Sequence, residues 1–456
     1  MLALDELRRE VESGAVDTVV VAFPDLYGRL VGKRYTGRFF LEEATSQGMH
    51  VCDYLLACDM EMDPSPGYAF TSWESGYGDL LARPDMASLR RASWQQRAAL
   101  VVCDAVTEAG DAVAVAPRSI LKSQLEKLEA RGLGSLMGSE LEFFLFRDDY
   151  REACRKGWRD LTTHQSYVED YHVLSGSFAE PVIGEIRRHV DASGVPVEFS
   201  KGEWGPGQHE INLRYAPALE MADRHEVYKL AAKEIAAAAG CSLTFMAKWD
   251  SRLAGNSLHV HMSLQDERGR PAFAAAGSPL LGTPVEAPDV FRHWLGGLLA
   301  HARELALFFA PTVNSYKRFQ AGTFAPTGIA WSYDNRTAGF RVVGRGPSLR
   351  VECRIPGADA NPYLVYAALI AAGRDGLERA LDPGPAFTGD VYQADGLPQV
   401  PRCLEEAISL LAGSAFARDA FGGEVVDHLL HFARVEQAAF GAAVTDWERQ
   451  RYFERI

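Results

Sequence analysis

The 456-residue sequence lacks any uninterrupted apolar run of the length, about 18 residues or more, that a membrane-spanning helix needs. Its first residues, MLALDELRREVESG, are too highly charged for a signal peptide and predict an amphipathic helix instead. No long basic segment is present, and the formal charge of −14 disfavours a nucleic-acid-binding surface. We therefore expect no membrane segment and no nucleic-acid partner.

Cysteine is also scarce, and no two cysteines form a CxxC pair. The seven are scattered, which is typical neither of a disulfide framework nor of a zinc ribbon: Cys52, Cys58, Cys103, Cys154, Cys241, Cys353 and Cys403. There is no GxSxG nucleophile motif, and 28–34 (GRLVGKR) has one residue too few between its glycines for a P-loop. We expect a cytoplasmic protein that is neither a covalent hydrolase nor a P-loop enzyme.

The length and the 47% hydrophobic content predict more than one hydrophobic core. Apolar and β-branched segments predict strands at 18–23, 29–35, 98–105, 139–146, 241–249, 258–264 and 348–356. Helices are expected at 4–13, 117–131, 180–193, 220–239 and 290–309, with a mostly helical tail from 361. This order predicts an α+β protein with an N-terminal domain, 1–112, and a larger second domain, 113–456.

Polar residues recur at alternate positions of three predicted strands, so that they share one face of each strand. They are Glu140 and Glu142 in SELEFFLF, His259 and His261 in LHVHMSL, and Arg350, Glu352 and Arg354 in SLRVECRIP. Any one of these patterns would also suit a solvated sheet face or an ion-pair ladder. Neighbouring carboxylates repel unless a cation lies between them, so three such strands together favour a metal site.

Glu203 and Glu210 flank a Gly-Pro-Gly turn in GEWGPGQHE and add two carboxylates. The candidate metal ligands are thus Glu140, Glu142, Glu203, Glu210, His259 and Glu352. Mainly oxygen ligands with one imidazole favour Mg²⁺ or Mn²⁺ over Zn²⁺, and paired ions suit phosphoryl transfer. Arginines that fit as clamps on phosphate and carboxylate oxygens are Arg318, Arg336, Arg341, Arg350 and Arg354. The sequence predicts a metal-dependent phosphoryl-transfer enzyme.

These segments resemble the glutamine synthetase superfamily over essentially the whole chain. The matching segments, in order, are FPDLYGRLVGKR, GSELEFFLF, GEWGPGQHEINL, GNSLHVHMSL, NSYKRF, NRTAGFRV and SLRVECRIPGADANPYL. The resemblance implies an N-terminal β-grasp domain, a catalytic domain with a curved antiparallel sheet, and a homo-oligomer. That oligomer is expected to be a dodecamer of two stacked hexameric rings, with active sites between subunits.

The resemblance also implies ATP and two or three Mg²⁺ or Mn²⁺ ions. By this likeness Glu142, Glu203 and Glu210 bind one ion, and Glu140, His259 and Glu352 bind the other. The residues implied to contact the nucleotide phosphates are His261, Arg336, Arg341 and Arg350.

Arg318, Arg354 and Gly255 are implied to hold glutamate, and Arg318, Arg336 and Glu203 to act in catalysis. In the implied reaction, ATP phosphorylates the γ-carboxylate of glutamate, and an amine then displaces phosphate to leave an amide.

One segment departs from the pattern of ammonium-using relatives. Those relatives carry VPGYEAP after NSYKR, whereas 320–326 reads QAGTFAP here, so Phe324 stands in the place of the glutamate. The N-terminal MHVCDY segment also lacks an aspartate at the matching place, although His50 and Asp53 lie close by. An aromatic ring in place of a carboxylate removes attraction for ammonium and adds apolar surface.

We therefore predict a γ-glutamyl-amine ligase that acts on a polyamine or a small amino alcohol such as ethanolamine, with Phe324 contacting the amine. Ordinary glutamine synthetase and a non-catalytic assembly protein are the alternatives. Glu203, His50 or Asp53 is a candidate for deprotonating the amine. Tyr392 falls where adenylylated relatives carry their modified tyrosine, but its neighbours differ and favour an ordinary surface-loop tyrosine.

Overall fold

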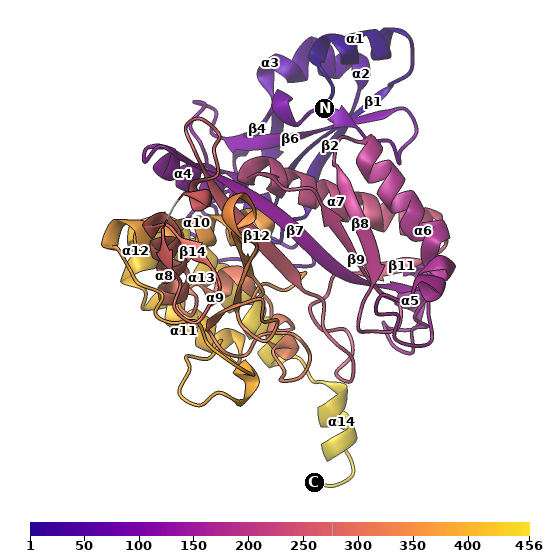
Figure 1. Cartoon of the computed structure of the whole chain (residues 1–456). Helices are drawn as coiled ribbons and strands as arrows, with labels where there is room; N and C mark the ends of the chain where they lie inside the picture. Colours follow the sequence, from indigo (N-terminus) through magenta and orange to yellow (C-terminus); the bar gives the residue numbers. More distant parts are fainter. Residues whose placement is uncertain (276) are drawn as a thin grey trace.

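The computed structural model describes residues 1–275 and 277–456 (Figure 1). It has an N-terminal sheet, a larger central sheet and surrounding helices, which confirms the α+β prediction. The strands are β1 Thr18–Pro24, β2 Leu30–Thr36, β3 Met49–Cys52, β4 Asp79–Pro84, β5 Arg90–Arg91, β6 Ala98–Val106, β7 Leu133–Phe146, β8 Val197–Gly202, β9 Gln208–Leu213, β10 Ala216–Pro217, β11 Ser242–Thr244, β12 Leu258–Asp266, β13 Ser278–Pro279, β14 Glu286–Ala287, β15 Trp331–Tyr333, β16 Phe340–Val343 and β17 Arg350–Cys353. The α-helices are α1 Leu4–Glu12, α2 Gly37–Phe39, α3 Thr45–Gln47, α4 Pro117–Glu129, α5 Tyr150–Arg155, α6 Val173–Ala192, α7 Ala218–Ala238, α8 Asp289–His301, α9 Ala306–Phe309, α10 Pro362–Arg379, α11 Leu404–Ala412, α12 Ala415–Phe421, α13 Gly423–Ala442 and α14 Asp446–Tyr452.

The N-terminal sheet has the order β2-β1-β6-β4-β3, with β5 paired to β6, and β1 runs parallel to β6. Alternate residues of β1 belong to different hydrophobic cores. Val19 and Val21 pack in the small N-terminal core with Leu7 of α1, whereas Val20 and Ala22 pack in the large central core. Burial on both faces explains the uninterrupted apolar runs of β1 and β6.

The central sheet has the order β15-β16-β17-β12-β7-β9-β8, and β10 and β11 also pair with β7. The long strand β7 crosses the middle of the molecule in Figure 1. One face of this sheet packs its apolar side chains, among them Leu141, Phe143 and Val260, into the large core with helices α4, α6, α7 and α10. The opposite face therefore carries the alternate, polar residues of the same strands.

Several predicted elements have different bounds in the structure, and three of these differences have a physical explanation. Helix α6 begins at Val173 rather than at 180 and contains Pro181, because burial of residues such as Ile183 and Ile186 outweighs the backbone hydrogen bond that proline lacks. The helix expected at 290–309 is interrupted after His301, where that ring contacts Glu304 and Asp375 at 2.5 and 2.7 Å. The strand expected at 241–249 ends at residue 244, the last that pairs with β7.

Arg118 of α4 joins the two parts of the chain. Its guanidinium is buried and donates to Asp223 of α7 at 3.0 and 2.9 Å, to Asp85 at 2.6 Å, and also to Asp104 of β6.

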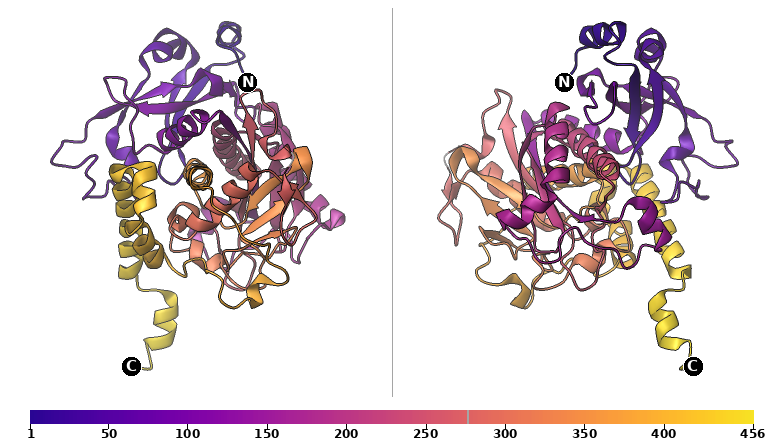
Figure 2. Two further views of the ribbon diagram at one scale, coloured as in Figure 1. Left: turned by 60° about the vertical axis from the view of Figure 1, so that its left-hand side comes forward. Right: turned by 90° about the vertical axis from the view of Figure 1, so that its right-hand side faces the viewer.

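Among the described residues, no helix combines the length and apolarity required to cross a membrane. The last helix, α14, projects away from the rest of the molecule and ends near the C-terminus (Figure 2).

Candidate active site

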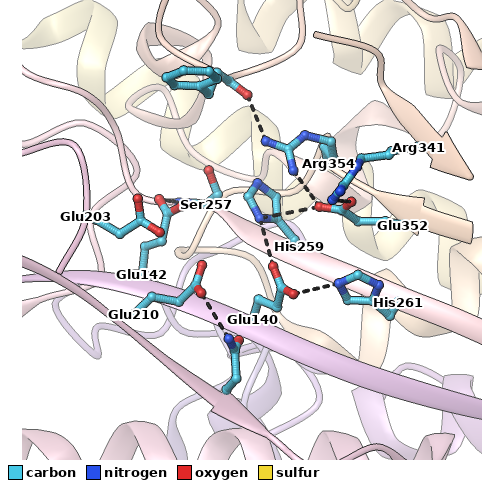
Figure 3. Close-up of polar contacts among 12 residues, drawn as sticks. Glu140, Glu142, Glu203, Glu210, Ser257, His259, His261, Arg341, Glu352 and Arg354 are labelled. Carbon is cyan, nitrogen blue, oxygen red and sulfur yellow. Dashed lines mark hydrogen bonds and ion pairs between the residues drawn. The ribbon is translucent and has the colours of Figure 1, made fainter. Parts of the chain in front are cut away.

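Five of the six predicted metal ligands project from one face of the central sheet, and the sixth, Glu203, lies in the turn beside it (Figure 3). Strand register explains this convergence, because directly opposed residues on antiparallel strands share a face. His259 of β12 lies opposite Glu140 of β7, and Glu142 of β7 lies opposite Glu210 of β9. In the same way His261 lies opposite Glu352 of β17. Glu203 follows β8 directly, in the turn that leads into β9.

Glu142, Glu203 and Glu210 form a carboxylate triad in which one oxygen from each lies within 4.8 Å of the others. Burial, together with the charge of Glu203, raises the pKa of Glu142 to about 8. Burial and the charge of Glu140 raise the pKa of Glu210 well above its usual value. A bound cation would stabilise the ionised form of these close carboxylates, so the triad fits a divalent ion with oxygen ligands.

Lys201 of β8 forms an ion pair with Glu203 at the edge of this triad. Burial alone would lower the pKa of Lys201, but the carboxylates of Glu210 and Glu203 outweigh burial and raise it. The lysine therefore carries its positive charge next to the proposed ion ligands.

A second group of ligands surrounds Glu140. Its carboxylate lies 3.3 Å from Nδ1 of His259 and 2.7 Å from Nε2 of His261. One ligand atom each of Glu140, His261 and Glu352 lie within 4.8 Å of one another, and the same is true, separately, of Glu140, Glu210 and His259. The predicted set of Glu140, His259 and Glu352 is thus divided between two groups that share Glu140.

His259 has the properties of a metal ligand. Burial and the charge of Arg354 lower the pKa of His259 to about 4, which keeps the imidazole neutral at neutral pH. Its Nε2 atom is buried and has no hydrogen-bond partner among the described residues. An unpartnered imidazole nitrogen beside carboxylates fits Mg²⁺ or Mn²⁺ with a mixed oxygen and nitrogen ligand set.

Three of the predicted arginines contact this group. Arg341 donates to Glu352 at 2.8 Å and to Asp334 at 2.5 Å, and Arg354 donates to Glu352 at 2.5 Å. Burial would raise the pKa of Glu352, but Arg354, His259 and His261 together outweigh burial and bring the pKa to about 2. Arg350 donates from Nε to Nδ1 of His261 at 3.1 Å. These arginines keep Glu352 ionised and hold His261 in place.

Arg318 lies behind the cavity wall rather than in it. Its buried guanidinium donates to the main-chain carbonyls of Arg354 and Ile355 at 2.9 and 2.8 Å, and to the hydroxyl of Ser257 at 3.0 Å. The same side chain packs against Gly255, where an added Cβ would lie 2.8 Å from Cγ of Arg318 and 2.3 Å from a carbonyl oxygen. Arg318 therefore supports the backbone that carries Arg354.

The ligands open into a cavity of about 540 Å³ whose rim includes the exposed Arg336. Phe324 lies at this rim, 44% exposed, with its ring edge-to-face against Trp204 at 5.8 Å between centroids. Its backbone has φ of +60°, and its carbonyl accepts a hydrogen bond from Arg354 at 3.4 Å. The predicted amine-contacting residue thus forms an aromatic wall beside the carboxylate triad.

A second cavity of about 590 Å³ adjoins the other end of the cluster. It is lined by Glu140, His261 and Arg350 together with apolar side chains such as Leu136 and Leu264. A cavity with basic residues at its inner end and apolar walls suits a nucleotide whose phosphates point toward the metal ligands.

Several residues of the site were not found from the sequence. Lys201 and Trp204 lie beside Glu203 in KGEWGPGQHE, where an exposed tryptophan next to acidic residues was an available signal. Tyr171 lies in an irregular segment that gave no signal. His50 and Asp53 belong to the N-terminal sheet region and are not among the residues that line the cavity of this chain.

Tyr392 is half-buried, and its hydroxyl donates to the carbonyl of Ala325 at 3.1 Å. The expectation of an ordinary surface-loop tyrosine therefore omits its contact with the segment that carries Phe324.

Comparisons with known proteins agree with this arrangement. The sequence-family model of the glutamine synthetase catalytic domain matches residues 114–452 of this chain. The chain is 50% identical over 455 residues to the γ-glutamylethanolamide synthetase GlnA4 of Streptomyces coelicolor, covering 100% of this chain and 96% of the relative. It is 34% identical over 456 residues to a glutamate–isopropylamine ligase of a Pseudomonas species, covering 99% and 98%. A solved structure described as a GmaS/ADP complex matches with a TM-score of 0.85 and 29% identity over 98% of this chain and 99% of that one.

The chain therefore belongs to the glutamine synthetase family. Ligases of this family generally use ATP and a divalent metal ion, in keeping with the acidic groups described above.

Proposed function

We propose that this protein is an ATP-dependent ligase that joins the γ-carboxylate of glutamate to a small primary amine such as ethanolamine. The observation that carries this proposal is the aromatic wall of Phe324 and Trp204 beside an intact carboxylate triad. The triad suits the phosphoryl-transfer step common to the family, and the wall suits an amine with a carbon body. The identity to relatives named for ethanolamide and isopropylamine ligation supports the same conclusion.

In the first step, a γ-carboxylate oxygen of glutamate attacks the terminal phosphorus of ATP, and ADP leaves. Divalent ions bound by the carboxylates and His259 would neutralise charge on the phosphate oxygens. Arg336, exposed at the rim, and Arg341 are suited to contact the transferring phosphoryl group. Arg354 is suited to hold glutamate, with Arg318 fixing the backbone of Arg354. Direct contact of Arg318 with glutamate stays a prediction.

In the second step, the amine nitrogen attacks the carbonyl carbon of the acyl phosphate, phosphate leaves, and the amine loses a proton. Phe324 and Trp204 would exclude water from one side of this reaction and contact the carbon body of the amine. Glu203, which precedes Trp204 in the chain and lines the same cavity, is the carboxylate we assign to receive the proton.

The finer features of the enzyme are part of the same proposal. We propose two or three Mg²⁺ or Mn²⁺ ions per site, a cytoplasmic location and a homo-dodecamer with active sites between subunits. The division into an N-terminal domain, 1–112, and a catalytic domain, 113–456, stays a prediction.

Release of phosphate from ATP, Mg²⁺ and glutamate tests the proposal, measured separately with ammonium, ethanolamine, isopropylamine, putrescine, spermidine and a bulky amine. Mass spectrometry of the products identifies the amide that forms. We expect a small primary amine to be used with a higher kcat/KM than ammonium. Efficient use of ammonium alone would make the chain an ordinary glutamine synthetase, and silence with every amine would favour a non-catalytic role.

A further inference from the structure

Lys201 places a cation at the edge of the proposed metal site, and the reaction described above does not use it. It lies on β8 directly opposite Glu210, and its ammonium forms an ion pair with Glu203. The two paired side chains are only 17% and 15% exposed. A positive group is therefore already in contact with one of the proposed ligands of the divalent ion.

Tyr171 offers this ammonium a second partner. The Tyr171 ring centroid lies 4.6 Å from Nζ of Lys201, within the range of a cation–π contact. The segment that carries the ring is hydrogen-bonded to the edge of β8, through Asp170 N–H to the Glu203 carbonyl at 3.1 Å and Tyr171 N–H to the Gly202 carbonyl at 3.4 Å. Tyr171 also has φ of +62°, a conformation that residues other than glycine rarely adopt and that is concentrated at functional sites.

The lysine also has room to move. Besides the active-site cavity, Lys201 and Tyr171 both line a neighbouring cavity of about 590 Å³, which is also lined by residues of α6. Glu180 and Arg187 in that cavity pair with each other, so neither is left as an unpaired charge there. The Lys201 side chain therefore borders two cavities.

We propose that Lys201 is a tethered cation that competes with a divalent ion for the carboxylates of Glu142, Glu203 and Glu210. Without the ion, its ammonium offsets the repulsion within the triad and keeps the ligands assembled. When the ion binds, the ammonium separates from Glu203 and keeps the face of Tyr171 as its partner, because two cations repel at such short range. This inference rests on the proposed metal site.

Titration of the purified full-length protein with Mn²⁺ tests the inference, with free Mn²⁺ followed by electron paramagnetic resonance. Lys201→Met keeps the aliphatic stem and removes the charge. We expect at least about tenfold tighter Mn²⁺ binding, equivalent to about 1.4 kcal/mol. We also expect a lower thermal midpoint for the metal-free variant, restored by saturating Mn²⁺. Lys156→Met, which removes an ion pair with Asp148 outside both cavities, is the matched control and should leave Mn²⁺ affinity unchanged.

Tyr171 provides a second arm of opposite sign. Tyr171→Ala removes the partner that stabilises the ammonium once it has left Glu203 and should weaken Mn²⁺ binding about two- to fivefold, whereas Tyr171→Phe keeps the ring and the affinity. Mn²⁺ binding by Lys201→Met that is no tighter than wild type overturns the inference, as does wild-type affinity in Tyr171→Ala. Absence of saturable Mn²⁺ binding by the wild-type protein would instead refute the metal site and the proposed function itself.

Discussion

Replacing Phe324 with glutamate tests the origin of amine selectivity most directly. The variant puts a carboxylate at the place where the resemblance to ammonium-using relatives implies one, and it removes the ring that packs against Trp204. Both residues are L-amino acids with a Cβ, so the positive φ at this position constrains them in the same way. The change therefore alters charge and apolar surface while leaving the backbone requirement as it is.

The expected magnitude follows from the geometry. A carboxylate about 5 Å from an ammonium attracts it by about 3 kcal/mol at an effective dielectric constant near 20. The side chain is 44% exposed, so solvent screening removes much of this attraction, and we expect about 1.4 kcal/mol, or tenfold, in favour of ammonium. Loss of the aromatic contact adds about 0.5–1.5 kcal/mol against the larger amine. Together the preference should shift by about twentyfold to a hundredfold.

Competition between ammonium and ethanolamine in one reaction measures this preference, because the ratio of products reports the ratio of the two kcat/KM values. Phe39→Glu is the control, since Phe39 is 46% exposed, stacks on Tyr35 at 5.3 Å and lies outside the cavity. Its product ratio should equal that of wild type. An unchanged ratio in Phe324→Glu would refute the assignment of Phe324 to the amine site.

Three further predictions follow from the cluster and its supports. Glu140→Ala removes the carboxylate shared by both ligand groups, so phosphate release should be abolished while circular dichroism stays native; wild-type activity would refute the ligand assignment. Arg118→Ala leaves the buried Asp223 without its ion-pair partner and should lower the free energy of unfolding in urea by about 3–5 kcal/mol, and a change below about 1 kcal/mol would contradict this. In metal-free protein, Glu142 has a folded pKa of about 8, above its unfolded value of 4.5, so its contribution to stability is present below pH 4.5 and is lost as pH rises through about 8. Chelator-treated protein should therefore lose up to about 1.4 kcal/mol per pH unit across this window, and saturating Mn²⁺ should abolish the slope; equal slopes with and without Mn²⁺ would count against a cation at the triad.

Local patterns were sufficient to predict most strands and the chemistry they carry. Alternation of polar and apolar residues placed Glu140 and Glu142 on one face of a strand and predicted a second such strand around His259, and β7 and β12 confirm both strands. Period-two geometry is a property of the extended backbone itself, so it is legible without tertiary information. The predicted start of α6, at residue 180, was wrong because the packing of the apolar face of this helix overrides the local effect of Pro181.

The sequence by itself determined that carboxylates, imidazoles and arginines exist in pairs on strands and that a family likeness connects them. Only the tertiary structure decided which strands lie side by side, and therefore that Glu142 faces Glu210 and that His261 faces Glu352. It also brought Tyr171 to Lys201 and placed Arg318 behind the cavity wall rather than in it. These contacts join residues far apart in the chain or in irregular segments, where strand register and loop packing, rather than any local periodicity, fix the distances.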